Sequence, residues 1–491
     1  MIIAYPADTV RALEEQAMAE VGDDALMQRA ATGLASAVMA EARRRVGTVY
    51  GARVLVLVGP GNNGGDALFA GARLAARGAA VRVVPCLGSP HPAGLAALRA
   101  AGGVLLALGD LLDGAGLAWP DLVVDGILGI GGRPGLPDEL ARVAVLTERA
   151  GVPLVAVDLP SGVPADPGAV PGPAFRATHT VTFGARKPCH LLEPARSRCG
   201  SVSLVDIGLD LAAVPDGGWL RQLEVDDLAR GWPYPHARSD KYSRGVLGVD
   251  TGSEDYPGAG VLSTYGAVHA GAGMVRFLGA EAPAAIIGAQ LPNVVFSAGR
   301  VQAHLLGSGW GDRADGHEVV AAALASGLPT VVDADGLRHL PRQLPASWLL
   351  TPHAGELARL LDRDRSWVEE DPVRAARAGA EATGATVLLK GASQVVVTPG
   401  RTDAGIALPG PAWTAQAGSG DVLAGVCGAL LAAGVPAAEA GMLGASLQAY
   451  VARRHPGPMP PQDLARHLPQ AVGELEVRAL ALARGRGPVR R

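Results

Sequence analysis

A phosphate-binding loop with an acid at its end is predicted at Gly418-Ser419-Gly420-Asp421. An apolar, Ala- and Gly-rich segment follows and reaches about Ala433, so the motif forms a loop that leads into a helix. Small residues let the backbone approach a ligand closely, and the first helical turn offers unpaired N–H groups to an anion. Asp421 lies where a carboxylate can accept a proton from a hydroxyl that attacks the phosphate. The alternative is that Asp421 only caps the helix, since Asp is a good N-cap residue.

A second Gly-rich loop stands in the first half of the chain, at Gly59-Pro60-Gly61-Asn62-Asn63-Gly64-Gly65-Asp66. It follows the apolar run 53–58, which suits a buried parallel strand, and precedes a helical pattern over 67–77. A strand, a Gly-rich loop and a helix place a ligand beyond the carboxyl end of the strand. The alternative is a tight turn with an Asx cap, although two adjacent Asn residues among four Gly are unusual for a turn.

Further polar residues follow other predicted strands, at 122–125 and 154–158. Asp125, Asp158 and Ser161 lie at or just beyond these strand ends, where the binding residues of a parallel sheet belong. Asn63, Asp125 and Ser161 together offer hard oxygen ligands, which suit K⁺ or a similar cation. Lys187 follows the strand 180–183 and is the one basic group of this set; the alternative is a solvated lysine.

The second half repeats the pattern of ligand-capable groups at strand ends. Gly-rich loops follow the apolar runs 246–249 and 304–306, and two carboxylates end the strand at 331–333. His353 follows a Pro after the strand at 348–350, and the alternative is an ordinary loop histidine. Lys390-Gly391 follows the strand 387–389 and is plausible for a nucleotide phosphate.

These groups need a scaffold, and strands that alternate with helices indicate a doubly wound parallel sheet in each half. Residues 9–45 are predicted as helix, and a linker is predicted within 208–240, including 215–218. We place the domain boundary near residue 215, so the chain holds two α/β domains.

The composition restricts the classes of partner. The 491 residues carry a net charge of −4 without a basic stripe, which argues against nucleic acid and membrane surfaces. The four cysteines lack CxxC spacing, so we interpret them as thiols of a reducing compartment rather than a zinc site or a disulfide framework. No apolar signal core opens the chain and no apolar run reaches the roughly 20 residues of a membrane span, so we expect a cytoplasmic location.

The first half resembles the epimerase domain of bacterial NAD(P)H-hydrate repair proteins. The motifs GPGNNGGD, DLVVDGILGIG, AVDLPSGVPAD and TVTFGARKP carry the resemblance, over residues 1–215. It implies a Rossmann-like three-layer fold, K⁺ at Asn63, Asp125 and Ser161, and proton transfer by Asp158 and Lys187. Ala67 replaces the Gly that most often follows the Asp of the first motif. The implied substrate-binding residues are Asn62, Asn63, Gly64, Gly65, Asp66, Gly129, Ile130, Gly131, Gly132, Arg133, Pro134, Gly135 and Asp158.

The second half, residues 225–485, resembles the ribokinase-like, ADP-dependent NAD(P)H-hydrate dehydratase domain. The motifs are VVDADGL, LLTPHAGELARL, LLKGASQVVV and GSGDVLAGV. Two departures are GSGWG at 307–311, where GPGLG is common, and the lack of a Thr-Gly pair within 414–417. The resemblance implies contacts to the hydrate from Ala259, Gly309, His353 and Asp421, and contacts to the nucleotide from Lys390, Gly391, Ala392, Ser393, Gln394, Gly418, Ser419 and Gly420.

The two resemblances imply one repair activity on damaged nicotinamide cofactors. The first domain epimerises R and S hydrates of NADH or NADPH, and the second dehydrates the S form with ADP and Mg²⁺, giving AMP and phosphate. Two alternatives stay open, a small-molecule kinase of ribokinase-like type and a non-catalytic nucleotide-binding protein. We also expect a homo-oligomer. The sequence is compatible with ADP or ATP as the co-substrate and with NADH or NADPH hydrate as the preferred substrate. It is equally compatible with direct passage of substrate between domains and with free diffusion.

Overall fold

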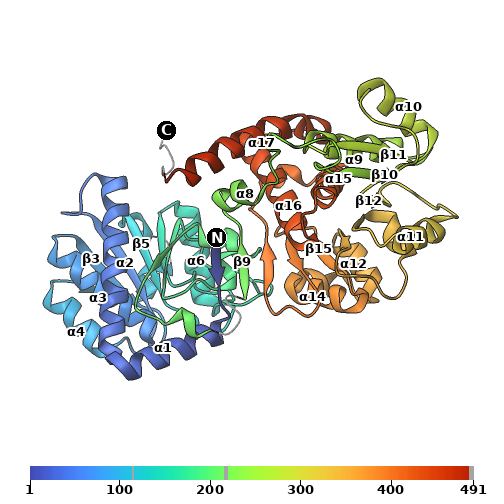
Figure 1. Cartoon of the computed structure of the whole chain (residues 1–491). Coiled ribbons are helices and arrows are strands. Elements are labelled where there is room, and N and C mark those ends of the chain that lie inside the picture. The colour runs from blue at the N-terminus through green and yellow to red at the C-terminus, as the bar shows by residue number, and fades with distance from the viewer. Residues whose placement is uncertain (113–114, 215–218, 486–491) are drawn as a thin grey trace. The chain divides into compact units, whose positions relative to one another are not determined.

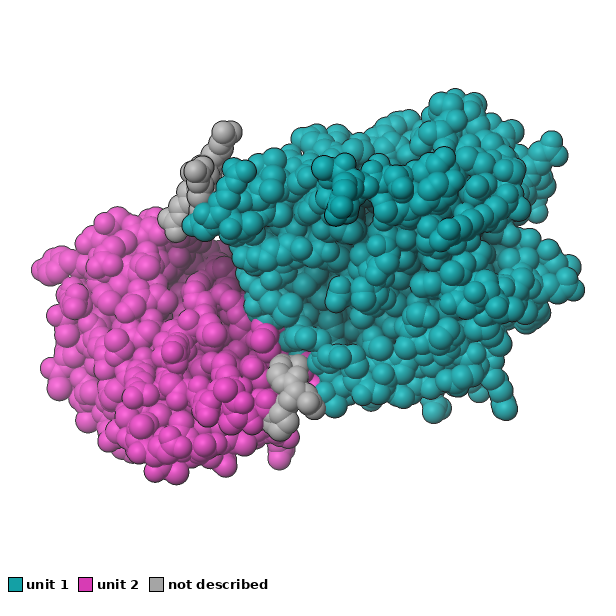
Figure 2. All heavy atoms as spheres, in the orientation of Figure 1, with its two compact units in different colours: residues 1–2, 220–491 teal, residues 3–219 magenta. Residues whose placement is uncertain are grey.

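The computed structural model describes residues 1–112, 115–214 and 219–485. Two compact units divide the chain: unit 1 holds residues 1–2 and 220–491, and unit 2 holds residues 3–219 (Figure 2). The linker predicted at 215–218 lies outside the described residues. The domain bounds 1–215 and 225–485 stay predictions.

Unit 2 contains a parallel sheet with the strand order β4-β3-β2-β5-β6-β7-β8. The elements from the N-terminus to the end of this unit are β1 (Ile2–Ala4), α1 (Ala7–Val21), α2 (Asp23–Val46), β2 (Arg53–Val58), α3 (Asn62–Ala76), β3 (Ala80–Pro85), α4 (Pro92–Ala100), β4 (Val104–Leu105), α5 (Gly109–Leu112), η1 (Ala115–Ala118), β5 (Leu122–Gly126), α6 (Asp138–Ala150), β6 (Leu154–Val157), β7 (His179–Phe183), η2 (Pro188–His190), α7 (Arg196–Cys199), β8 (Ser201–Val205) and η3 (Leu211–Ala213).

Helices cover both faces of this sheet, with α2 and α3 on one face and α6 on the other (Figure 1). The strands alternate their side chains between two cores: Val54 and Val56 of β2 pack with α2 and α3, whereas Leu55 and Leu57 face α6. The strand order reverses between β2 and β5, which makes the carboxyl ends of these strands the expected place for a ligand.

Unit 1 contains a mixed sheet with the strand order β9-β17-β16-β15-β14-β13-β12-β10-β11, in which β16 is antiparallel to both neighbours. Its elements are β9 (Leu220–Gln222), α8 (Val225–Gly231), β10 (Val246–Asp250), α9 (Pro257–His269), β11 (Met274–Phe277), α10 (Glu281–Gln290), β12 (Ala303–Leu306), α11 (Gly316–Ala325), β13 (Thr330–Val332), η4 (Ala334–His339), β14 (Leu349–Leu350), α12 (Ala354–Leu361), α13 (Arg365–Glu370), α14 (Pro372–Thr383), β15 (Thr386–Leu389), β16 (Val395–Val397), β17 (Ala404–Ile406), η5 (Ala412–Thr414), α15 (Ser419–Ala432), α16 (Ala437–Arg454) and α17 (Pro461–Ala483).

A large hydrophobic core of unit 1 joins α9, α15, α16 and α17 to one face of the sheet. Here the order reverses between β10 and β12, so the loops after these strands share one edge. The predicted α/β class of both halves is confirmed.

Three local predictions differ from the structure. The Gly-rich loop predicted through Asp66 is shorter, because α3 already begins at Asn62. The helix predicted over 9–45 is two helices, because Gly22 adopts φ 87° between α1 and α2, a conformation that favours glycine. The strand β8 was not predicted, since its outward-facing residues break the apolar run. No helix among the described residues is long and apolar enough to cross a membrane.

Gly425→Ala is expected to destabilise unit 1 by about 1–3 kcal/mol, because it overpacks the contact between α9 and α15. A Cβ at Gly425 meets the backbone oxygen of Ser263 at 2.0 Å, so the helices must separate. Gly473→Ala in α17 is the matched control: its Cβ meets nothing within 4 Å, and a helical Gly→Ala exchange stabilises by about 0.5–1 kcal/mol. Urea unfolding of both variants measures the difference, and equal stabilities contradict the packing argument.

Candidate active sites at the carboxyl ends of the two sheets

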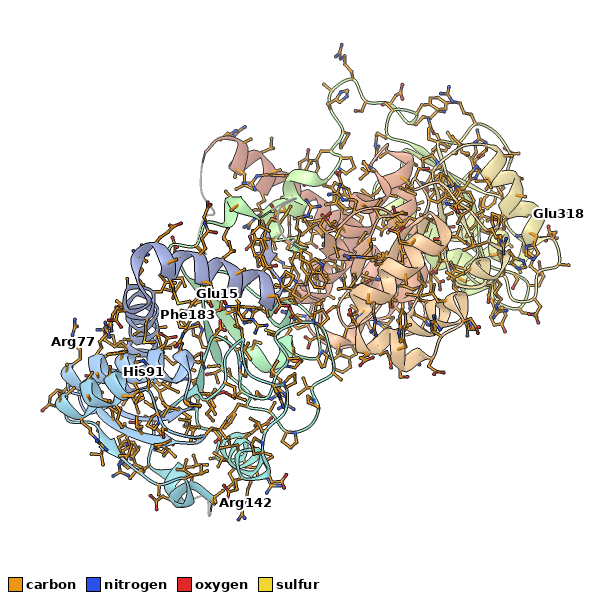
Figure 3. The ribbon with its side chains drawn as sticks, turned by 90° about the horizontal axis from the view of Figure 1, so that it is seen from below. Glu15, Arg77, His91, Arg142, Phe183 and Glu318 are labelled. Atoms are coloured by element: carbon orange, nitrogen blue, oxygen red, sulfur yellow. The ribbon has the colours of Figure 1, made fainter. Side chains whose placement is uncertain are left out.

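A cavity of about 670 Å³ lies in unit 2 where the loops after β2 and β5 meet α1. Figure 3 labels Glu15, His91 and Phe183, three lining residues from separate segments of the unit. The predicted residues that line the cavity are Asn62, Asn63, Asp66, Gly129, Ile130, Gly131, Gly132 and Asp158. The predicted residues Gly64, Gly65, Arg133, Pro134, Gly135 and Lys187 are absent from this lining. Glycine is needed at position 64 for packing, because a Cβ there would meet the backbone oxygen of Gly59 at 2.2 Å.

Asp158 projects into this cavity from a strained backbone position directly after β6. Its φ is 67°, which is uncommon for a residue with a side chain. The backbone is held on both sides, since its N–H donates to the carbonyl of Val181 at 2.8 Å and its carbonyl accepts from His190 Nε2 at 2.9 Å. The position of the carboxylate is therefore fixed before any ligand binds.

Lys187 lies behind Asp158 and forms an ion pair with its carboxylate. The lysine side chain is 0% exposed, and its ammonium also donates to Thr182 Oγ1 at 2.9 Å and to the carbonyl of Phe183 at 3.3 Å. Burial would raise the pKa of Asp158, but Lys187, with help from Thr182, leaves this pKa below its ordinary value. The pair therefore presents an ionised carboxylate to the cavity.

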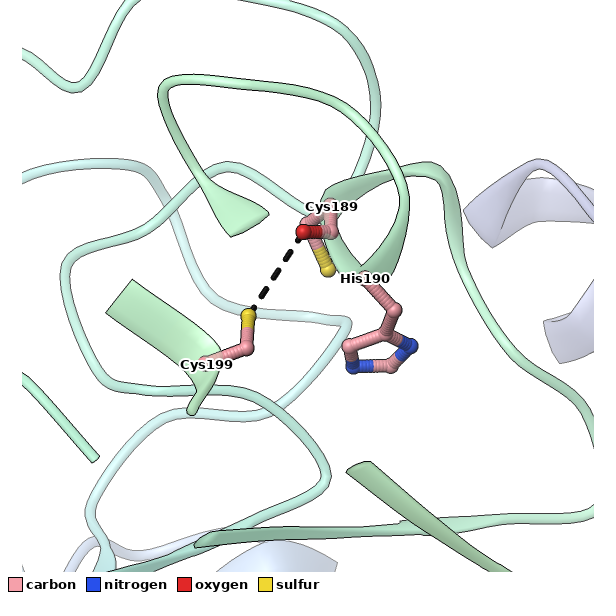
Figure 4. A group of neighbouring side chains, drawn as sticks. All are labelled: Cys189, His190 and Cys199. Atoms are coloured by element: carbon pink, nitrogen blue, oxygen red, sulfur yellow. Dashed lines mark hydrogen bonds between the residues drawn. The ribbon is translucent and has the colours of Figure 1, made fainter. Parts of the chain in front are cut away.

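Three potential metal ligands, Cys189, His190 and Cys199, lie next to the Asp158–Lys187 pair. Their ligand atoms are within 4.8 Å of one another (Figure 4). Both imidazole nitrogens are already used: Nδ1 accepts from the backbone N–H of Lys187 at 3.0 Å and Nε2 donates to Asp158. Burial raises the pKa of the Cys189 thiol, which disfavours the thiolate that binds metals. We therefore interpret the cluster as packing that positions Lys187 and Asp158.

The three residues predicted to bind K⁺ converge beside the cavity. Ser161 Oγ donates to Asp125 Oδ1 at 2.6 Å, and the Ser161 backbone N–H donates to Oδ2 at 2.7 Å. Asn63 lies against Gly129 nearby, and its Nδ2 is buried without a hydrogen-bond partner. Asp125 is fully buried, yet no cationic side chain among the described residues lies within ion-pair distance of it. Burial raises its pKa to about 6.

Four further carboxyl groups line this cavity: Glu15 and Asp24 are exposed, whereas Glu14 of α1 and Asp66 of α3 are withdrawn from solvent. Neither Glu14 nor Asp66 forms a hydrogen bond or an ion pair with the described residues. Burial is the main cause that raises the pKa of Glu14 to about 7, opposed by Lys187 and reinforced by Asp158. Burial raises the pKa of Asp66 well above its ordinary range, with further contributions from Asp158 and Glu14. Glu14 was not predicted from the sequence, because one acidic residue on an amphipathic helix carries no distinguishing signal.

In unit 1 the predicted anion loop forms the beginning of α15. Gly418 is the N-cap with φ 89°, and Ser419, Gly420 and Asp421 make up the first turn. Asp421 is thus inside the helix rather than its N-cap, and no side chain caps the turn. The N–H of Ser419 donates to the carbonyl of Gln416 at 3.3 Å, and the N–H groups of Gly420 and Asp421 are available to an anion.

A buried network connects this loop to the sheet through Asp333. Lys390 Nζ donates to Asp333 Oδ1 at 2.6 Å, Thr351 Oγ1 donates to the same oxygen at 2.8 Å, and Ser308 Oγ donates to Oδ2 at 2.9 Å. A Cβ at Gly420 would lie 3.2 Å from Lys390 Nζ, so the ammonium adjoins the anion loop. The strand-end carboxylates were noticed in the sequence, but Ser308 and Thr351 were missed, because single hydroxyl residues in loops are common.

Asp421 faces this network and carries a shifted pKa. Burial and then the negative charge of Asp333 raise its pKa to about 7, against the opposing effect of Lys390. Burial would lower the pKa of Lys390, but Asp333 and Glu356 leave it above its ordinary value. A carboxyl group that titrates near neutral pH beside a fixed ammonium is suited to accept a proton.

The other predicted residues of unit 1 surround the same sheet edge. Gly309 adopts φ 66° and lies against Ala259, where a Cβ would approach the alanine methyl at 2.5 Å. His353 is half-exposed and caps α12, with Nδ1 accepting from the N–H groups of Gly355 and Glu356. The backbone of His353 also forms an isolated parallel β-bridge with that of Lys390. Lys390 begins the loop between β15 and β16, which consists of Lys390, Gly391, Ala392, Ser393 and Gln394.

Comparisons with known proteins agree with the two-part organisation. The family model described as YjeF-related protein N-terminus matches residues 23–189, and that described as NAD(P)H-hydrate dehydratase matches residues 247–470. A bifunctional NAD(P)H-hydrate repair enzyme of Mycobacterium tuberculosis is 45% identical over 452 residues, which cover 89% of this chain and 90% of the relative. The chain belongs to the bifunctional NAD(P)H-hydrate repair enzyme family.

Two further proteins are similar to this chain. The bifunctional NAD(P)H-hydrate repair enzyme of Mycobacterium leprae is 44% identical, over 89% of this chain and 90% of the relative. The crystal structure of an ADP/ATP-dependent NAD(P)H-hydrate dehydratase from Bacillus subtilis, co-crystallised with ATP and Mg²⁺, is 22% identical with a TM-score of 0.48. It covers 52% of this chain and 98% of the other.

Proposed function

We propose that the chain repairs hydrated nicotinamide cofactors in two steps, one in each unit. Unit 2 interconverts the R and S hydrates of NADH or NADPH, and unit 1 dehydrates the S form with ADP, giving AMP and phosphate. The observation that carries the proposal is the 45% identity to a bifunctional NAD(P)H-hydrate repair enzyme along 89% of the chain. The ionised Asp158 in one cavity and the anion loop ending in Asp421 in the other unit give each step a chemical centre.

In the dehydration, Asp421 accepts the proton of the C6 hydroxyl as the hydroxyl oxygen attacks the terminal phosphorus of ADP. The bond from that phosphorus to AMP breaks, and the N–H groups of Gly420 and Asp421 and the ammonium of Lys390 stabilise the charge that develops. Phosphate then leaves C6, assisted by the ring-nitrogen lone pair. Loss of a C5 proton restores the double bond of the dihydronicotinamide.

In the epimerisation, Asp158 accepts the proton of the C6 hydroxyl while the bond between C6 and the ring nitrogen breaks. The resulting aldehyde rotates and the ring closes on its other face, which inverts C6 without an oxidant or a reductant. Lys187 acts indirectly in this proposal, because it is buried behind Asp158 and keeps that carboxylate ionised. Asn62, Asn63 and the loop 129–132 surround the substrate.

A K⁺ ion fits the donor set of unit 2. Asp125, Ser161 and Asn63 would hold it, since a buried carboxylate with only neutral partners lacks a counter-charge and the unpartnered Asn63 amide is free to turn its oxygen inward. When bound, the ion supplies positive charge beside the loop that follows β5. Mg²⁺ enters unit 1 with ADP as part of the co-substrate. A homo-oligomer and a cytoplasmic location stay predictions.

The kinase and the non-catalytic alternatives are separated from repair by one assay. The full chain is mixed with R and S NADH hydrate, ADP, Mg²⁺ and K⁺, and the near-ultraviolet absorbance of the dihydronicotinamide ring is followed. We expect complete recovery of NADH with one phosphate released for each NADH. Recovery that stops at the S fraction contradicts an active unit 2. A stable phosphorylated product supports the kinase, and nucleotide binding without turnover supports the non-catalytic protein.

A further inference from the structure

The cavity of unit 2 contains more acidic groups than the proposed epimerisation uses. Asp158 is paired with Lys187, whereas Glu14 and Asp66 line the same cavity without a hydrogen-bond or ion-pair partner among the described residues. Unpartnered carboxyl groups that are largely desolvated are costly in a folded protein, so their retention at a cavity points to a role with the ligand.

The ring opening itself requires an acid as well as a base. When Asp158 accepts the hydroxyl proton, the electron pair of the breaking bond moves to the ring nitrogen N1, which must receive a proton. Lys187 is absent from the cavity lining and is 0% exposed, so its ammonium cannot reach a ring in the cavity without leaving Asp158. The donor must therefore be another group in contact with the cavity.

Glu14 has the properties of that donor. It comes from α1, a different element from the sheet edge that carries Asp158, so the two carboxyl groups approach a bound ring from separate segments. The environment separates their titrations: the pKa of Asp158 is lowered beside Lys187, whereas burial and Asp158 raise that of Glu14 to about 7. When the environments of two carboxyl groups separate their pKa values in this way, the group with the lower pKa serves as the base and the other as the acid.

Asp66 is the competing group, and its position argues against it. It lies in the first turns of α3, directly after β2 and on the same sheet edge as Asp158, and is only 8% exposed. Burial, with further contributions from Asp158 and Glu14, raises its pKa well above its ordinary range. Reversible exchange needs an acid that approaches the ring from a different segment than the base, and α1 supplies one in Glu14.

We propose that Glu14 is the acid that protonates ring nitrogen N1 when the C6–N1 bond breaks and takes the proton back when the ring closes. The inference rests on the proposed epimerase function of unit 2. Over one cycle each carboxyl group gives back what it received: Asp158 returns the proton to the aldehyde oxygen and Glu14 regains its own. No co-reactant is consumed.

The test measures exchange of separated R and S NADH hydrate by the full chain without ADP, so that dehydration does not proceed. Glu14→Gln is expected to lower kcat for exchange on the order of 10²-fold, with KM changed by less than about threefold. Glu14→Asp keeps a carboxyl group and is expected to retain at least about a tenth of kcat. Glu20→Gln removes the same charge from an exposed residue of α1 outside the cavity lining and is expected to stay within about twofold of the parent.

Several results overturn the inference. A Glu14→Gln rate within about threefold of the parent shows that Glu14 transfers no proton in the rate-limiting step. Equal losses in Glu14→Gln and Glu14→Asp assign the effect to the shape of the cavity. Equal losses in Glu14→Gln and Glu20→Gln assign it to the overall charge of α1. Absence of exchange in the parent chain refutes the epimerase function itself. This result differs from a failure of the Glu14 assignment, in which the parent chain is active and only the variants decide.

Discussion

Asp421→Asn is expected to lower the rate of S-hydrate dehydration on the order of 10²–10⁴-fold, the usual contribution of a general base. The amide keeps the size of the side chain but cannot accept the hydroxyl proton. Since Gly418 rather than Asp421 is the N-cap of α15, the substitution leaves the anion loop in place. Affinity for ADP should therefore change little, and exchange of R and S hydrate in unit 2 should be unchanged.

The pH dependence gives a second measurement of the same group. Burial and Asp333 raise the pKa of Asp421 to about 7, so the carboxyl group is protonated and inactive as a base below that pH. The rate of dehydration at low hydrate concentration should rise with pH and level off above about 7. Asp312→Asn changes a fully exposed acid one residue beyond the loop 307–311 and is the control, expected within about twofold of the parent. A pH-independent rate, or an Asp421→Asn protein with full turnover, would falsify the assignment.

The order of strands, loops and helices was predictable because the buried strands are short apolar runs. Val54 to Val58 and Leu122 to Val124 are buried on both sides of a parallel sheet and therefore read as continuous apolar segments. The Gly-rich loops after them mark the sheet edge by their composition. The α/β class and the family both follow from these segments, and both are confirmed.

The contacts that tune the site were less accessible from sequence. Asp158 and Lys187 were predicted as two proton-transfer groups, but only the fold reveals that one lies behind the other and is completely buried. Glu14 is distant in sequence from Asp158 and belongs to a helix whose exposed face is rich in acids, so nothing in its neighbours distinguishes it from a solvated residue. The pKa of such a group depends on burial and on charges brought together by tertiary structure.

The Asp158–Lys187 pair gives the second large effect. Asp158→Asn is expected to lower exchange of R and S hydrate on the order of 10²–10⁴-fold, because the base is lost. Lys187→Met removes the charge that keeps Asp158 ionised, so the carboxyl group becomes protonated in its buried position and exchange falls as well. Dehydration of the S hydrate in unit 1 should continue in both variants, which provides an internal control for the protein and for ADP.

The free energy of unfolding of these variants shows whether activity is lost with the base or with the folded structure. Either single substitution leaves a buried group without its partner, which costs about 3–5 kcal/mol when one member of a buried ion pair is removed. The double variant Asp158→Asn with Lys187→Met removes both charges, so it should be more stable than either single variant while remaining inactive in exchange. Urea unfolding and the exchange assay measure the two properties on the same samples. Recovery of exchange in the double variant would mean that neither group transfers the proton, and additive losses of stability would mean that the two side chains do not act as a pair.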